Sequence, residues 1–112
     1  MPIEKGPPDL RVDLFGGKGE VRVWSLLPGA AEPFTAILSC ELAPGGVVGR
    51  HVQQEFPEVV LGLEGEGLAT VDDEARRLNA GDAVYLPLGS VLSIANQSGR
   101  VPLRYLIIKA RC

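Results

Sequence analysis

The sequence predicts an all-β domain folded as a barrel or jelly roll. Glycine and proline together supply 14 + 9 = 23 of the 112 residues, and turn residues this frequent between short apolar runs favour strands over helices. Several of those runs alternate apolar and polar side chains, which is the two-residue period of a half-buried strand. The length suits one domain with a real hydrophobic core. We therefore expect about nine or ten short strands.

The first part of the chain is expected to hold an arm and three strands. Residues 1–9 contain three prolines and a glycine, which interrupt any regular pattern and indicate an N-terminal arm. Residues 10–15 and 20–27 alternate, and each run ends at a turn rich in glycine or proline. Residues 34–42 form a longer apolar strand. Trp24 is expected in the core, with a place at a dimer interface as the alternative.

The second half is expected to hold the remaining strands, separated by turns. The acidic residues 72–74 lie where a solvent-exposed hairpin tip is expected. The turns are indicated by Gly65-Glu66-Gly67, by Asn79-Ala80-Gly81-Asp82 and by Asn96-Gln97-Ser98-Gly99. The predicted strands cover residues 59–63, 68–71, 75–78, 83–86, 91–95 and 103–108.

Charge and hydropathy exclude several classes of partner. The net charge of -3 and the pI of about 5.1 argue against nucleic acid, which requires a clustered basic face. No apolar run approaches the length that spans a bilayer, and the N-terminal residues lack the apolar segment of a signal peptide. A cytoplasmic protein without a membrane partner is the expectation.

The two cysteines, Cys40 and Cys112, do not make a disulfide framework. Two free thiols in a reducing compartment are expected. Cys40 lies in the apolar strand 34–42, where it is either a buried inert side chain or a thiol that lines a pocket. The phase of this strand does not follow from the sequence, so both alternatives stay open.

The polar residues that suggest a site lie within residues 44–67. His51 is the only histidine of the chain. On a strand, residues two apart point to the same face, so His51 and Gln53 are expected side by side. A bend at Phe56-Pro57 brings Glu58 back toward them. An imidazole, an amide and a carboxylate would then form a polar centre in a largely apolar protein.

Two motifs of this sequence resemble those of the cupin family, in particular its small single-domain members. The first cupin motif is matched by Gly45, His51, Gln53, Glu58 and Gly65, with glutamine where the family usually has a second histidine. The second motif is matched by Gly81, Pro87, Gly89 and Asn96, with Leu92 at the position of the family's last histidine. The two motifs and their connection span about half of the chain.

The resemblance implies a double-stranded β-helix, or jelly-roll barrel, as a single domain over residues 1–112. It also implies a homodimer and a small-molecule ligand. In the family a divalent iron, manganese, nickel or zinc ion is often held inside the barrel, and here His51, Gln53 and Glu58 are the corresponding ligands. With one histidine in the chain, no protomer can build a site of two or three histidines.

Three functions remain open on the sequence. The first is a small-molecule-binding cupin with a degenerate metal site, in which Arg50, Gln53, Gln54 and Tyr85 contact the ligand above an apolar floor that includes Leu92. The second is a metal-dependent dioxygenase, isomerase or decarboxylase that acts on a small oxygenated metabolite. The third is a non-catalytic sensing or structural module. In an enzyme, His51 and Glu58 are the catalytic candidates, as a base and its orienting partner. In a structural module they would bond to each other.

Overall fold

The computed structural model describes residues 6–111 and confirms the predicted all-β jelly roll. Within this range there is no helix long and apolar enough to cross a lipid bilayer. The strands are β1 (Asp9–Val12), β2 (Glu20–Ser25), β3 (Phe34–Leu42), β4 (Val47–Val52), β5 (Glu58–Glu64), β6 (Gly67–Val71), β7 (Glu74–Arg77), β8 (Ala83–Leu86), β9 (Val91–Asn96) and β10 (Leu103–Ala110).

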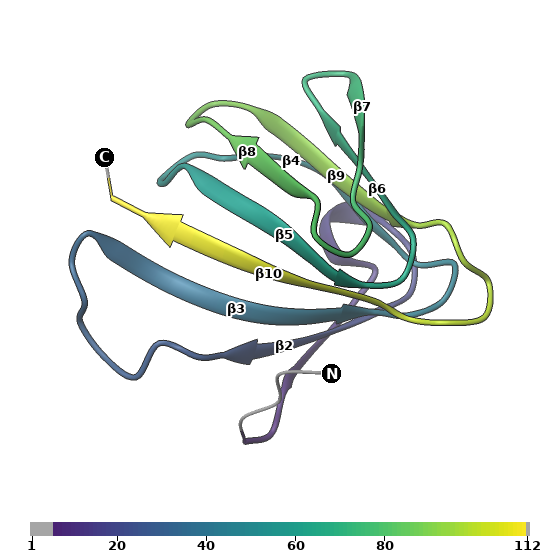
Figure 1. Cartoon of the computed structure of the whole chain (residues 1–112), viewed down its shortest axis with the longest axis horizontal. Helices are drawn as coiled ribbons and strands as arrows, with labels where there is room; N and C mark the ends of the chain where they lie inside the picture. Colours follow the sequence, from purple (N-terminus) through teal and green to yellow (C-terminus); the bar gives the residue numbers. More distant parts are fainter. Residues whose placement is uncertain (1–5, 112) are drawn as a thin grey trace.

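The strands form two antiparallel sheets that face each other (Figure 1). The larger sheet has the order β1-β2-β3-β10-β5-β8, and the smaller has the order β4-β9-β6-β7. The chain passes from one sheet to the other between β3 and β4, between β4 and β5, and again between β5 and β6. From β3 to β6, therefore, no strand pairs with the next one along the chain, and β10 lies between β3 and β5 in the larger sheet.

The first predicted strand, residues 10–15, is shorter than expected. β1 starts at Asp9, inside the predicted arm, and ends at Val12. A short 3₁₀ helix, η1 (Leu14–Gly16), follows, and the backbone is left-handed at Asp13 before it and at Phe15 within it, with φ of 52° and 55°. Within the arm, residues 1–5 lie outside the described part of the chain. The carbonyl of Gly6 accepts a hydrogen bond of 3.1 Å from the indole of the buried Trp24.

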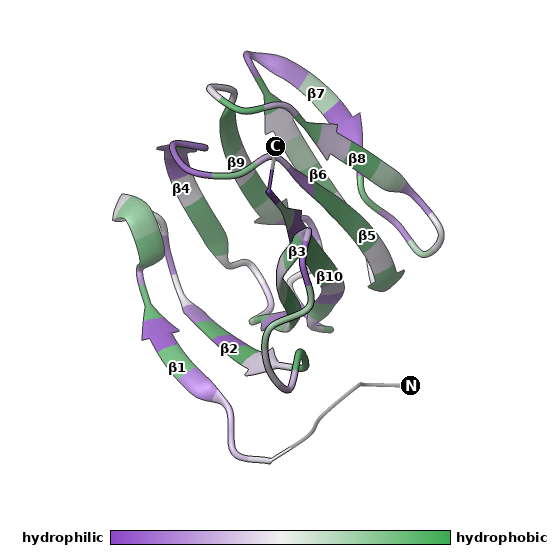
Figure 2. Cartoon of the chain, turned by 90° about the vertical axis from the view of Figure 1, so that its left-hand side faces the viewer, coloured by the Kyte–Doolittle hydropathy of each residue, from purple (hydrophilic) through white to green (hydrophobic). Residues whose placement is uncertain are grey.

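The core lies between the sheets and is built by alternation along the strands. Hydrophobic residues recur on the strands of both sheets (Figure 2). On β10 the residues Leu103 and Tyr105 are buried, and Ile107 packs against the same core. Burial of large apolar side chains of this kind stabilises a fold by about 1.5–3 kcal/mol each. The interior face of β10 thus carries every second residue from Leu103 onward.

The asparagine of the second motif, Asn96, has a structural role. Its side chain is 5% exposed. Nδ2 donates hydrogen bonds to the carbonyl oxygens of Leu42, Ala43 and Val101 at 3.2, 3.1 and 2.9 Å. Oδ1 accepts a bond of 2.9 Å from the backbone N–H of Ser98. One buried amide therefore joins the loop after β3 to the loop between β9 and β10.

Candidate functional site

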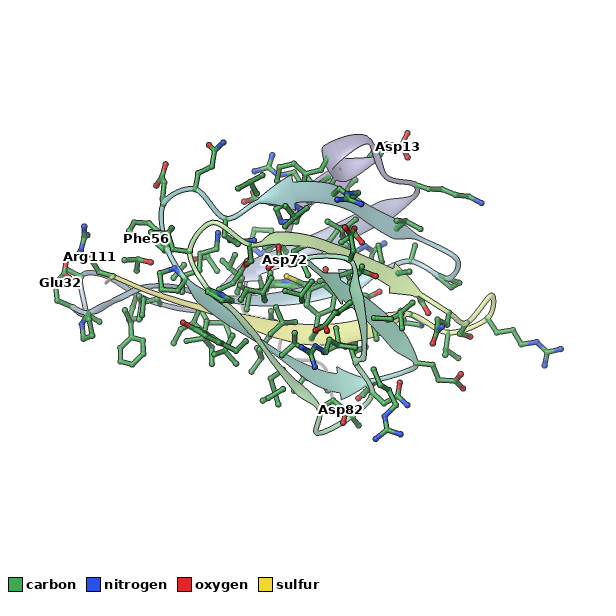
Figure 3. All side chains as sticks on the ribbon, turned by 90° about the horizontal axis from the view of Figure 1, so that it is seen from above. Asp13, Glu32, Phe56, Asp72, Asp82 and Arg111 are labelled. Atoms are coloured by element: carbon green, nitrogen blue, oxygen red, sulfur yellow. The ribbon has the colours of Figure 1, made fainter. Side chains whose placement is uncertain are left out.

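A cavity of about 560 Å³ lies between the two sheets. Its apolar part includes Val48, Ile94 and Tyr105, and the polar side chains gather where β4 and β10 end and β3 and β5 begin. Figure 3 shows Glu32, Phe56 and Arg111 together at one end of the molecule. The guanidinium of Arg111 bonds to Glu32 at 3.0 Å and lies 5.6 Å from the centroid of the Phe56 ring. Phe56 itself lines the cavity.

His51 lines the cavity from β4, and its surroundings fix its tautomer. Nδ1 lies 2.9 Å from the carbonyl oxygen of Gly49. A carbonyl can only accept, so Nδ1 carries the proton and Nε2 keeps a lone pair. Burial lowers the pKa of His51 below its ordinary value of 6.5, and the charge of Lys109 acts in the same direction, while the bond to Gly49 opposes them. The imidazole is therefore neutral at pH 7.

The ring of Phe15 stacks on the imidazole of His51. The ring centroids are 4.0 Å apart and the planes are inclined by 14°. The segment that carries Phe15 can approach β4 because two glycines face each other across the contact. A Cβ atom at Gly17 would collide with the carbonyl of Val47, and one at Gly49 would collide with the carbonyl of Phe15. The helix η1 beside β4 is visible in Figure 2.

Gln53 and Glu58 are buried and line the same cavity as His51. Their side chains are 5% and 4% exposed. Within residues 6–111, Nε2 of Gln53 and Oε2 of Glu58 have no hydrogen-bond partner, and neither has Oγ1 of Thr35, which also faces this cavity. Buried polar atoms are nearly always bonded in native proteins. Three exceptions around one cavity indicate a place for a polar ligand.

Burial shifts the titration of Glu58. Removal from water raises the pKa of this carboxyl above its ordinary value of 4.5, and the positive charge of Lys109 partly opposes the rise. Lys109 faces Glu58 directly across the antiparallel pair of β10 and β5. Desolvation outweighs the attraction, so the carboxyl keeps its proton to higher pH than an exposed glutamate.

Lys109 is a cavity residue that the sequence analysis missed. It is partly buried at the end of β10, and it lines the cavity with Tyr105 and Ile107. The predicted strand ended at residue 108, two positions before the end of β10 at Ala110. Continued alternation from Tyr105 would have placed Lys109 on the interior face.

Cys40 is both a buried side chain and a thiol that lines the cavity, so it combines the two alternatives. Its thiol is buried at 3% exposure and also lines the cavity. Cys40 faces Tyr105 across β3 and β10. Burial, followed by the charge of Glu58, raises the pKa of the thiol to about 12. A thiol in this state is a weak nucleophile at neutral pH.

The other predicted contact residues are divided between the cavity and the surface. Gln54 and Leu92 line the cavity, Leu92 from β9. Arg50 and Tyr85 are not among the residues that line this cavity, so their contact with a ligand stays a prediction. Arg50 precedes His51 on β4, points to the opposite face and pairs with Asp73 at 3.0 Å. Tyr85 is 64% exposed on β8.

The cupin resemblance implies a divalent metal held by these donor side chains. His51, Gln53 and Glu58 reach one cavity, but within residues 6–111 no group of three or more histidine, cysteine or acidic residues can hold an ion. Gln53 offers a neutral amide, and Leu92 contributes no donor where the family has a histidine. Lys109 places a positive charge beside Glu58, which opposes a divalent cation. The residues present do not fit a complete metal centre.

Comparison with known proteins gives one family and several relatives. The family model described as "Cupin domain" matches residues 38–109. The dimethylsulfoniopropionate lyase DddW of Ruegeria pomeroyi is 39% identical over 82 residues, which is 68% of this chain and 53% of the lyase. The chain thus spans about half the length of this curated relative.

Solved structures resemble the whole chain. A predicted oxalate decarboxylase from Thermotoga maritima has a TM-score of 0.88 at 26% identity, covering 100% of this chain and 99% of that one. A conserved barrel domain protein from Salinispora arenicola has a TM-score of 0.74 at 26% identity, with 100% and 92% covered. In both cases the similarity includes the N-terminal strands β1 and β2.

Proposed function

Because the chain belongs to the cupin family, we propose that it binds a small organic molecule in the cavity between its sheets, at a metal site that has degenerated. His51, Gln53 and Glu58 form the polar centre of this cavity. The proposal includes direct contact between these side chains and the ligand, without a resident divalent ion.

One observation carries the proposal. Thr35, Gln53 and Glu58 each hold a buried polar atom that lacks a partner within the described chain, and all three line one cavity. Each such atom costs about 1–3 kcal/mol when it stays unpaired. A ligand that supplies the missing partners offsets this cost on binding. The volume of about 560 Å³ lies within the range of small-molecule pockets, which is about 300–1,000 Å³.

A metal-independent proton transfer is the second candidate function. His51 is neutral with its lone pair on Nε2, which is the state of a general base. The names of two relatives support chemistry on small oxygenated metabolites, since one is a dimethylsulfoniopropionate lyase and another a predicted oxalate decarboxylase. A metal-dependent dioxygenase, isomerase or decarboxylase is less well supported, because the donor set lacks a histidine at Leu92.

Two measurements test the proposal. Elemental mass spectrometry of tag-free protein, beside His51→Ala, should find metal far below one ion per chain in both. Near-stoichiometric metal in the wild type that is lost in His51→Ala would contradict the proposal and support the metalloenzyme alternative. Thermal shifts with a panel of small metabolites should then find stabilising ligands for the wild type. Ala36→Leu, which fills cavity space, should abolish those shifts, while Ala75→Leu on the exposed strand β7 should not.

The proposal also includes a homodimer in the cytoplasm. The edge strand β1 exposes two apolar side chains, Leu10 at 54% and Val12 at 66%. Exposed apolar edge strands commonly pair with another chain. Light scattering after size exclusion should give the mass of two chains, and Val12→Lys should reduce it to one. The cytoplasmic location stays a prediction from the sequence.

A further inference from the structure

Within residues 6–111, Lys109 is a basic side chain of the cavity interior that forms no hydrogen bond or ion pair. Lys109 lies on the interior face of β10, two residues beyond Ile107 and four beyond Tyr105, and all three line the cavity. Its position is fixed on both sides, because it pairs with Ala36 on β3 and with Glu58 on β5. The strand end is held by a hydrogen bond from the N–H of Ala110 to the carbonyl of Pro57 at 3.3 Å.

Lys109 does not simply neutralise Glu58. The two residues are direct cross-strand neighbours, yet no ion pair joins them, and Oε2 of Glu58 is one of the unpartnered atoms of the described chain. A lysine whose role was to compensate a buried carboxylate would form the close pair that buried charges require. Ammonium and carboxyl both remain able to bond to a third group in the cavity.

The other charges along the cavity lie at its rim. Asp9, Arg11 and Glu55 line the opening but are exposed, so water and salt screen them. The interior charge that a bound molecule meets therefore comes from Lys109 and Glu58. In the same cavity, Nε2 of Gln53 is a hydrogen-bond donor without a partner among the described residues.

From this arrangement we infer that the ligand is a small carboxylic acid, bound as its anion, whose carboxylate accepts hydrogen bonds from Lys109 and Gln53. Its body is apolar, because it lies against Val48, Ile94 and Ile107. A hydroxyl or N–H group on the ligand donates to Oε2 of Glu58. The inference rests on the proposed function and specifies the ligand class of the same cavity.

The test uses two probes of the same shape that differ in charge, 3-methylbutanoate and 3-methylbutanamide. Their affinities are measured by NMR titration of the isotope-labelled full chain and of three variants. Lys109→Met keeps the aliphatic stem and removes the charge. Lys109→Arg keeps the charge. Lys18→Met is the matched control, because Lys18 does not line the cavity.

The wild type should bind the carboxylate about tenfold more tightly than the amide, because a hydrogen bond between two charged groups is stronger than one to a neutral acceptor. Lys109→Met should lose that preference and leave the amide affinity unchanged, whereas Lys109→Arg and Lys18→Met should keep it. Equal binding of both probes, or a preference that survives Lys109→Met, overturns the carboxylate inference while the cavity proposal stands. If neither probe binds the wild type, the inference and the proposed function both fail.

Discussion

Leu92 lies directly opposite His51 in the antiparallel pair of β4 and β9. The leucine is 1% exposed, so an apolar side chain fills the space beside the single imidazole of the chain. The relation explains why the polar centre lacks the donors of a metal site although the surrounding motifs are present. A single substitution at Leu92 would therefore supply the missing donor.

Leu92→His should create divalent-metal affinity. The new imidazole would face His51 across the strand pair and complete a set of two histidines and a carboxylate, which suits several transition metals. We expect zinc affinity to rise about tenfold or more, equivalent to about 1.4 kcal/mol, as measured by calorimetry. Leu92→His combined with His51→Ala is the control and should lose the gain. An affinity no greater than that of the wild type would show that the site is not a degenerate metal centre.

Glu58→Gln should stabilise the fold at neutral pH. The folded pKa of Glu58 is raised above 4.5 by burial, so its stability contribution is fully present below the unfolded pKa and is lost as pH rises through the folded pKa. The neutral amide avoids that loss, and we expect a gain of about 1–3 kcal/mol at neutral pH. Urea unfolding at acidic and neutral pH measures it.

The exposed Glu66 supplies the control for this experiment. Glu66→Gln should change the free energy of unfolding little at either pH. The advantage of Glu58→Gln should shrink as the pH falls below the unfolded pKa. A variant that is less stable than the wild type at neutral pH would mean that the carboxylate has a stabilising partner.

Cys40 should resist thiol reagents in the native state. With a pKa of about 12, almost none of the thiol is ionised near pH 8, and only the thiolate reacts. In a Cys112→Ser background, the reaction with a disulfide reagent should proceed at the rate of unfolding and become fast in urea. Since the folded pKa is raised, the fold should also lose stability as pH rises from 9 towards 12. Rapid labelling of folded protein would contradict this assignment.

The strand pattern could be predicted because each strand carries its own signal. Two predicted strands, residues 34–42 and 83–86, have the observed bounds of β3 and β8. Their alternation and flanking turn residues are local features. The same rule could have excluded Arg50, since it neighbours His51 on one strand and must face the other way.

Other parts of the site depend on contacts between distant segments. The stack of Phe15 on His51 joins residues 36 positions apart, 51 − 15, and it requires a left-handed backbone at Phe15, which its residue type disfavours. The inclusion of Lys109 depends on where β10 ends, and strand ends are set by pairing partners. The phase of Cys40 likewise became clear only from its pairing with Tyr105.

Gly49→Ala should displace the segment that carries Phe15. The added methyl group would collide with the carbonyl of Phe15, and backbone on both sides leaves no flexible group to move. We expect a loss of stability of about 1–3 kcal/mol, measured by urea unfolding. Gly29→Ala is the matched control, because nothing lies within 4 Å of its Cβ position. Equal stability of the two variants would mean that the segment moves freely.

Phe15→Ala should raise the pKa of His51. Burial is the largest cause of the lowered pKa, and the stacked ring of Phe15 covers one face of the imidazole. Its removal admits water, which favours the charged form and moves the pKa towards 6.5. Because the chain has one histidine, an NMR titration of its ring protons in tag-free protein reports this pKa without ambiguity.

Leu88→Ala is the control for this titration, because it removes an exposed side chain outside the cavity, and it should leave the pKa of His51 unchanged. A lowered folded pKa also makes the stability of the fold decrease as the pH drops below 6.5, and this decrease should be smaller in Phe15→Ala. If the pKa of His51 does not move in Phe15→Ala, the sheets alone desolvate the imidazole.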